Sequence, residues 1–340
     1  MHIRKFRNKL VISAASLLAM MTAGCSMVTD APEACPAQLR VRFVYDYNIK
    51  FADAFAHEVK SVCVWAFDSD GRLVWSDNVS GPQLSTGDFY IDTPLTEGKY
   101  DFVSWCGLEG NSDYSLATYT PSSKEELEVK LNTLAENGEN VSKSHIPGLY
   151  HGYVSNVEYK VDPFAPSFKT VTIPLMKDTK DIRVMLQHLD GSEIDNKDFS
   201  CTITTDDANL AWNNALLSSP VVTYSPWNIR YGQTAAPGVR TMTTVSSLLF
   251  DMSTSRLSTE RDATLTIHRN WDDRDIIRIN LIDYLLLVKG HYGDMSDQEY
   301  LDRQDDYSMV FFIDQNSNWY AAGGIFINNW AVVPPQHNEM

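Results

Sequence analysis

The acidic side chains near the C-terminus are the first candidates for chemistry, because clustered carboxylates can bind cations. Five of them could hold calcium weakly, although the solvated face of a short helix explains them more simply: Asp294, Asp297, Asp302, Asp305 and Asp306. Residues 68–71 (DSDG) begin like a calcium-binding loop but lack the later glycine and glutamate of an EF-hand. We therefore predict a hairpin turn at residues 68–71 and no metal site.

Signatures of catalysis are missing from the sequence. It contains no GxSxG, HExxH, P-loop or GxGxxG motif, and its eight histidines are scattered without metal-ligand spacing. We predict that the chain is not an enzyme, that it has no catalytic residues and that it binds no cofactor. An exported enzyme remains as a third function class, which would require converging carboxylates or a Ser/His pair.

Aromatic side chains in the second half could stack on sugar rings. Tryptophan and tyrosine in strands belong more often to a core, and that is the simpler interpretation. A lipid-anchored protein that binds glycans at the cell surface is therefore the alternative function, and it requires exposed aromatic residues in a row on one sheet face. The candidates are Trp212, Trp227, Trp319, Tyr320 and Trp330.

The first 24 residues have the pattern of an export signal. Residues 1–9 are basic, residues 10–21 form an apolar run, and small residues follow immediately before Cys25. A basic segment, a short apolar segment and an exit of small residues are typical of a cleaved signal peptide rather than of a membrane-spanning helix. We expect residues 1–24 to be removed on export.

Cys25 is the residue with the clearest chemical role. The sequence Ala23-Gly24-Cys25 resembles a bacterial lipobox, in which the thiol takes a diacylglycerol and the cysteine becomes the new N-terminus. Thr22 departs from the leucine that is commonest there, and a plain secretory signal with an incidental cysteine is the alternative. Each buried methylene of an attached acyl chain, such as palmitate, contributes ~0.8 kcal/mol, so several chains anchor stably. We predict lipidation of Cys25 and a lipidated tether over residues 25–38.

Export would bring the four remaining cysteines outside the cytoplasm, where they could pair. Cys35 precedes the first strand and Cys106 ends a later one, so a bridge between these two could attach the N-terminal strand to its sheet. Cys63 and Cys201 lie inside strand patterns, and we expect buried thiols there.

Charge and composition exclude several classes of protein. The 340 residues carry a net charge of −16, and loss of four basic residues with the signal peptide makes the mature chain about −20. So acidic a protein repels phosphate backbones, which excludes nucleic acids as partners. Apolar residues make up 44% and charged residues 21%, which excludes disorder.

Alternating apolar and polar residues dominate the mature chain. Leu39, Val41 and Phe43 begin the pattern, and many short runs like theirs follow, separated by turns. Capping boxes predict only two helices, over 125–131 and 297–303. The strand pattern restarts after a polar segment at residues 176–180. We predict an all-β fold with two tandem β-sandwich domains, at residues 39–176 and 177–340.

A family resemblance agrees with this organisation and covers nearly the whole mature chain. The run from Cys35 to Trp75 resembles the FimB-like fimbrial anchor family, the minor fimbrial subunits of type V pili. The blocks that continue the resemblance, in order, are YDFVSWCG (100–107), KDIRVMLQHL (180–189), HRNW (268–271), IDYLLLVK (282–289) and IFINNW (325–330).

The resemblance implies a lipoprotein with two transthyretin-like sandwiches. Such a protein is expected to be anchored in the cell outer membrane and to be exposed on the cell surface at the base of a fimbrium. It would anchor the fimbrium, support cell adhesion and end assembly by binding the stalk pilin or accessory fimbrial subunits. Tip or accessory roles are alternatives.

Type V pilins join by strand complementation, in which an extended segment of one subunit completes the sheet of another. An anchor that keeps its first strand offers no open groove. The last strand could be donated to the pilin or could be internal, and both possibilities stay open. The candidate partner-binding residues are Ile325, Phe326, Ile327, Trp330 and Val332.

Overall fold

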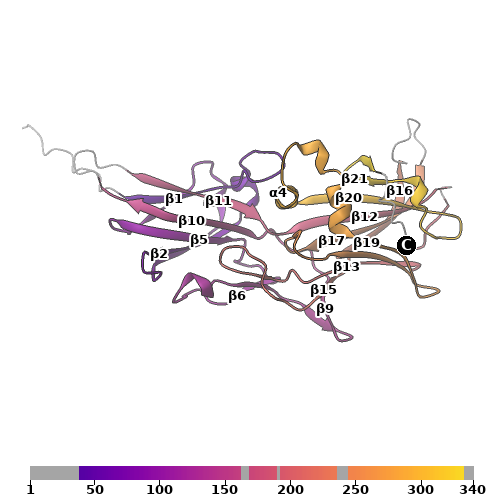
Figure 1. The fold of residues 1–340 in the computed structure, drawn as a ribbon, viewed down its shortest axis with the longest axis horizontal. Helices are drawn as coiled ribbons and strands as arrows, with labels where there is room; N and C mark the ends of the chain where they lie inside the picture. Colours follow the sequence, from indigo (N-terminus) through magenta and orange to yellow (C-terminus); the bar gives the residue numbers. More distant parts are fainter. Residues whose placement is uncertain (1–37, 162–167, 190–191, 236–243, 333–340) are drawn as a thin grey trace, which may run out of the picture.

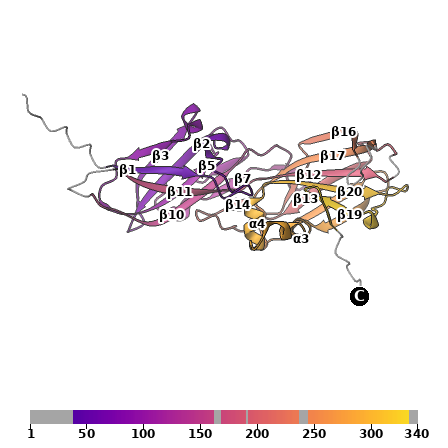
Figure 2. The same ribbon diagram turned by 90° about the horizontal axis from the view of Figure 1, so that it is seen from above.

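Two β-sandwiches lie end to end along the long axis of the molecule (Figures 1 and 2). The structure is a computed structural model and describes residues 38–161, 168–189, 192–235 and 244–332. Strands dominate it, which confirms the predicted all-β class. None of the helices among these residues is long and apolar enough to cross a membrane.

The first sandwich is a seven-stranded sheet that folds over on itself. Side chains of strands that are not neighbours in this sheet, such as Phe43 and Val64, share one buried core. The strand order is β3 (Leu73–Ser80), β2 (Ser61–Asp68), β5 (Gly98–Cys106), β10 (Tyr150–Tyr159), β11 (Lys169–Lys177), β1 (Leu39–Val44) and β4 (Tyr90–Thr93).

The second sandwich consists of two six-stranded sheets. One has the order β16 (Asn228–Ala235), β17 (Thr244–Thr254), β12 (Lys180–His188), β20 (Asp306–Ile313), β21 (Ile325–Ile327) and β22 (Trp330–Val332). The other has the order β19 (Arg274–Asn280), β18 (Thr264–Arg269), β13 (Phe199–Thr205), β15 (Val222–Tyr224), β9 (Glu139–Ser142) and β8 (Leu134–Glu136).

The two halves of the chain exchange strands, so the division at residues 176 and 177 is not a clean one. Strand β11 ends at Lys177 and β12 begins at Lys180, so the connection lies where the polar segment was found. However, β8 and β9 come from the first half and join a sheet of the second sandwich, through parallel pairing of β9 with β15. A three-stranded sheet likewise combines β14 (Asn209–Leu210) with β7 (Val129–Leu131) and β6 (Tyr114–Leu116).

One predicted helix is confirmed and the other is wrong. Helix α4 (Asp297–Arg303) begins as predicted, with the Ser296 side chain accepting a hydrogen bond from the Glu299 amide. The segment 125–131 instead contains a short 3-10 helix, η2 (Lys124–Glu126), followed by β7, because alternating Val129 and Leu131 fill a core. The remaining elements are α2 (Phe55–Glu58), α3 (Leu281–Leu286), η1 (Pro82–Ser85), η3 (Lys289–Tyr292) and η4 (Ala321–Gly323).

Candidate partner-binding strands and the cleft between the sandwiches

The first strand is an inner strand of its sheet. The chain pairs β1 in parallel with β11 and antiparallel with β4. Alternation buries Leu39, Val41 and Phe43, and the Phe43 ring stacks on Phe55 with 5.8 Å between ring centroids. Each such large side chain contributes about 1.5–3 kcal/mol when fully buried. Removing β1 would therefore break two strand pairings and open the core.

The C-terminal residues form a hairpin in the chain's own sheet. Strand β21 pairs with β20, and a turn at Asn328 and Asn329, both with positive φ, leads back into β22. The side chains of Ile325 and Ile327 are fully buried in the core of the second sandwich. The sequence left open whether the last strand is internal or is donated to a pilin. In this structure Ile325 and Ile327 are internal.

The other three candidate residues, Phe326, Trp330 and Val332, are partly buried or exposed. The Phe326 ring meets Phe312 edge-on at 6.2 Å, and Val332 packs partly buried against the core. Trp330 is exposed and its ring stacks on His291, with 3.7 Å between ring centroids. Because β22 is the last strand of its sheet and has only three residues, it offers a short edge.

The aromatic residues considered for sugar stacking do not form one row. Trp227 lies beside β16 and Trp330 lies in β22, at opposite edges of the same sheet. Trp212 meets Tyr153 edge-on, and Trp319 packs against Phe311 in the core. Three of the five side chains are exposed, and they lie apart from one another: Trp227, Tyr320 and Trp330.

Three of the five acidic residues, Asp297, Asp302 and Asp305, form ion pairs. Asp297 pairs with Lys289, and Asp305 pairs with Lys177. Asp302 is buried beside Arg256, so the prediction of a wholly solvated helix face was wrong for this residue. No group of side chains that could hold a metal ion occurs in the described part of the chain. Residues 68–71 form the turn between β2 and β3, with the Asp68 carboxylate accepting hydrogen bonds from the Asp70 and Arg72 amides.

The cysteines in the described residues carry free thiols. Cys63, Cys106 and Cys201 are all buried, and burial raises the pKa of Cys63 and of Cys106 to about 12. The Cys106 thiol lies 3.4 Å from the Ser104 hydroxyl, inside the first sandwich. The structure therefore does not contain the predicted bridge to Cys106, because this side chain points into the core. Cys25 and Cys35 lie outside the described residues.

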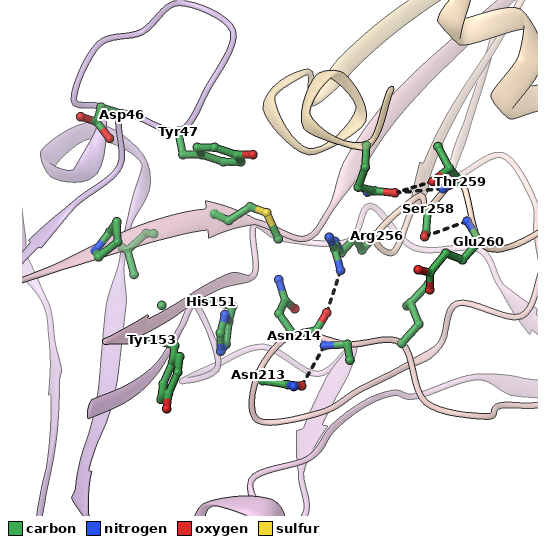
Figure 3. A pocket seen from close by; sticks show the side chains of 17 residues that line it. Asp46, Tyr47, His151, Tyr153, Asn213, Asn214, Arg256, Ser258, Thr259 and Glu260 are labelled. Carbon is green, nitrogen blue, oxygen red and sulfur yellow. Dashed lines mark hydrogen bonds between the residues drawn. The ribbon is translucent and has the colours of Figure 1, made fainter. Parts of the chain in front are cut away.

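A cleft of about 580 Å³ lies between the two sandwiches (Figure 3). Asp46 and Tyr47, which follow β1, and Tyr153 of β10 line it from the first sandwich. Residues 213–216, residues 258–260 and Gln298 are among those that line it from the second. The cleft combines aromatic, amide and hydroxyl groups, a surface that a polar ligand could contact.

Buried charges lie beside this cleft. The Arg256 guanidinium donates to both carboxylate oxygens of Asp302 and, through Nη1, to the Asn214 carbonyl. Asp178 accepts from the Asn214 side-chain amide at 2.8 Å. All three guanidinium nitrogens are thus bound to protein atoms, so Arg256 joins segments of the fold.

Burial shifts the pKa values of this cluster. Desolvation raises the pKa of Asp178 to about 7 although Arg256 lies nearby, and it lowers the pKa of Lys180 to about 8. At the edge of the cleft, desolvation lowers the pKa of His151 to about 4, which keeps its imidazole neutral at physiological pH. The Lys180 ammonium donates to the Asp302 carbonyl at 3.0 Å.

The loop after β1 is clamped by helix α4. The Ile49 amide donates to the Arg303 carbonyl at 2.9 Å, and the Arg303 guanidinium lies over the rings of Tyr47 and Phe51. Lys177 also pairs with Asp305 at 2.6 Å, across the junction. Sequence reasoning missed these contacts, since their partners are far apart in the chain and no local pattern links them.

The comparisons with known proteins identify the family. The model of the fimbrillin-A associated anchor proteins Mfa1 and Mfa2 matches residues 32–334. The chain belongs to this family. That confirms the resemblance to fimbrial anchors inferred from the sequence, and membership in the Mfa1 and Mfa2 family indicates a fimbrial location at the cell surface. No curated protein sequence matches the chain.

Solved structures share the fold of this anchor family member. A candidate adhesin from Bacteroides thetaiotaomicron is 33% identical, with a TM-score of 0.74 over 90% of this chain and 99% of that one. A candidate polysaccharide-binding protein from the same organism is 30% identical, with a TM-score of 0.75 over 89% and 100%. The fimbrial anchor protein Mfa2 from Porphyromonas gingivalis has the same fold at 16% identity, with a TM-score of 0.63 over 88% of this chain and 99% of that one.

Proposed function

We propose that the chain is an outer-membrane lipoprotein that anchors a fimbrium and ends its assembly by binding the stalk pilin. The observation that carries this proposal is the position of β1, paired on both sides by β11 and β4. A subunit whose first strand stays in place has no open groove in its first sandwich. A growing polymer that needs such a groove stops at this subunit.

Attachment to the membrane is proposed to run through the lipid on Cys25. Residues 25–38 then connect the lipid to β1, which begins at Leu39. In this proposal the first sandwich lies next to the membrane and the second sandwich farther from it, since the two lie end to end (Figure 1).

The pilin is proposed to bind through strand complementation. Donation of residues 325–332 by this chain would take Ile325 and Ile327 out of their own core, at a cost of several kcal/mol. We therefore favour a complex in which the pilin supplies the extended strand and this chain supplies a free sheet edge.

The proposal is tested on outer membranes from cells that produce the tagged full chain. We expect the wild type to incorporate labelled palmitate and to co-purify a stalk pilin identified by mass spectrometry. The Cys25→Ser variant should take up no label and should leave the membrane fraction. Unchanged labelling of that variant, or a wild type that co-purifies no fimbrial subunit, would contradict the proposal.

A lipid-anchored glycan-binding protein is the second candidate function. The observation in its favour is the 30% identity with a candidate polysaccharide-binding protein. The cleft with Tyr47 and Tyr153 is a place where a sugar ring could stack. A glycan array probed with the wild type and with a Tyr153→Ala variant tests this function, which requires binding that the variant loses.

A further inference from the structure

Strand β16 turns large apolar side chains toward the core side of its sheet at an open edge. In its pairing with β17, Ile229 is opposite Phe250 and Tyr231 is opposite Leu248. Directly opposed residues in an antiparallel pair lie on the same face. Phe250 and Leu248 are fully buried, so Ile229 and Tyr231 belong to the core face.

These side chains are nevertheless exposed. Ile229 is 47% exposed and Tyr231 51%, and Trp227, two residues before Ile229, is 39% exposed. Trp227 precedes β16 and lines a separate hollow with Arg183 and Asp251. We call Ile229 and Tyr231 the edge row. Their position on the core face of a sandwich is one at which a covering element would normally bury them.

The other edge strands of the two sandwiches are protected. Strand β3 places Asp77 opposite the buried Val64, so a charge points inward from that edge. Strand β19 carries three charged residues, and β4, β8 and β22 have only three or four residues each. Among the described edge strands, β16 is thus the long one whose core face shows apolar groups without an inward charge.

The opposite face holds β16 in place. Arg183 and Arg230 both bind the carboxylate of Asp251, at 2.7 Å and 2.9 Å, and the Asn228 side chain donates to it as well. These contacts link β12, β16 and β17. Because β16 is already ordered by these contacts, it loses little conformational entropy when a partner strand pairs with it.

Charge at one end of the edge row indicates the chemistry of the partner. Tyr231 borders a hollow of about 420 Å³ that Glu193, Asp195 and Asp198 also line. Carboxylates around such a hollow favour a cationic side chain, through attraction that is strongest where water is partly excluded. An arriving strand therefore fits best with a lysine or arginine beside Tyr231.

We propose that β16 accepts an extended strand of a fimbrial partner subunit, with apolar residues at alternate positions and a basic residue at the Tyr231 end. The added strand would continue the sheet through main-chain hydrogen bonds and cover the edge row. This inference rests on the proposed function, since it names the edge at which the pilin binds. Figures 1 and 2 both place β16 at the opposite end of the molecule from β1, the side that faces away from the proposed lipid anchor.

The test uses the full-length lipoprotein in detergent and the stalk pilin that co-purifies with it. The double variant Ile229→Glu/Tyr231→Glu should bind this pilin at least about tenfold more weakly than the wild type, because it places two carboxylates where apolar groups and a cation should sit. Both positions are already half-exposed, so the thermal midpoint should hardly change. Residues 228–232 should also become protected from hydrogen exchange when the pilin binds.

A matched control uses half-exposed residues of the first sandwich. The variant Val74→Glu/Tyr90→Glu changes side chains that are 45% and 44% exposed on β3 and β4, and it should bind pilin like the wild type. Equal pilin binding by the wild type and the β16 variant would overturn the inference and leave the proposed function standing. A wild type that binds no pilin would overturn both. Loss of self-association or of glycan binding in the β16 variant, with pilin binding unchanged, would assign the edge row to a second copy or to a sugar and would also overturn the inference.

Discussion

Arg256 and Asp302 form a bidentate ion pair at the junction of the two sandwiches. The Nε–Oδ1 distance is 2.9 Å and the Nη2–Oδ2 distance is 3.0 Å, and both side chains are largely buried. Asp178, in the connection between β11 and β12, lies 4.0 Å from the same guanidinium. Two parallel hydrogen bonds fix the orientation of the pair as well as its charge.

Breaking this pair should destabilise the protein strongly. Asp302→Ala leaves a buried guanidinium without its main partner, which costs about 3–5 kcal/mol. The free energy of unfolding is measured in urea on the mature chain carrying Cys25→Ser. Asp297→Ala is the control, because its pair with Lys289 is exposed and contributes only about 0.2–1 kcal/mol. Equal effects of the two substitutions would contradict the role of the buried pair.

The contribution of Asp178 to the free energy of unfolding should fall as the pH rises from about 4 to 7. Burial raises the folded-state pKa of Asp178 to about 7, so the native chain holds a proton that the unfolded chain has already lost. In Asp178→Asn this dependence disappears, while the side chain can still accept from Asn214. Between pH 5 and pH 8 the variant should therefore gain on the order of 2 kcal/mol relative to the wild type. Urea unfolding at four pH values measures this, and parallel curves would refute it.

The C-terminal hairpin should behave as part of the core. Ile327→Ala removes a fully buried side chain and should cost about 2–5 kcal/mol. Trp330→Ala loses mainly the stack on His291 and should cost about 0.5–1.5 kcal/mol. If the hairpin were donated to a pilin instead, the amides of β20 would lose protection from hydrogen exchange on complex formation. We expect them to stay protected.

The thiols should be unreactive in the folded protein and all free after unfolding. Cys63, Cys106 and Cys201 are buried, and their raised pKa values keep them protonated. Iodoacetamide should therefore label none of these three in native buffer. In urea without reductant it should label them and Cys35 as well. Two labels instead of four would reveal a disulfide, against the free Cys106 thiol of the structure.

Local signals predicted the elements that depend on local physics. The alternation in β1 and the cap of α4 were readable, because strand faces and helix starts are set by residues two to four positions apart. The helix prediction for residues 125–131 failed because the pairing of β7 with β6 and β14 outweighed a local helix preference. Helix α3, whose Asn280 cap was overlooked, follows directly on a strand of similar apolar composition.

The candidate site was less predictable than the fold. Lipidation of Cys25 stays a prediction, because it rests on a short motif outside the described residues. The partners of Arg256 lie 42 and 46 positions away in the sequence, and no spacing rule connects them. The edge row looked like ordinary strand sequence, since only the structure shows that Ile229 and Tyr231 are exposed on the end strand of their sheet.

The most direct measurement of the central claim is electron microscopy of cells whose own copy of the gene is replaced. The wild type should restore fimbriae attached to the cell surface. Cys25→Ser should give fimbriae that are released into the medium, whereas Cys201→Ser, which alters a buried thiol, should behave like the wild type. Fimbriae of the Cys25→Ser cells that stay attached, in the same number and length as in the wild type, would contradict the account.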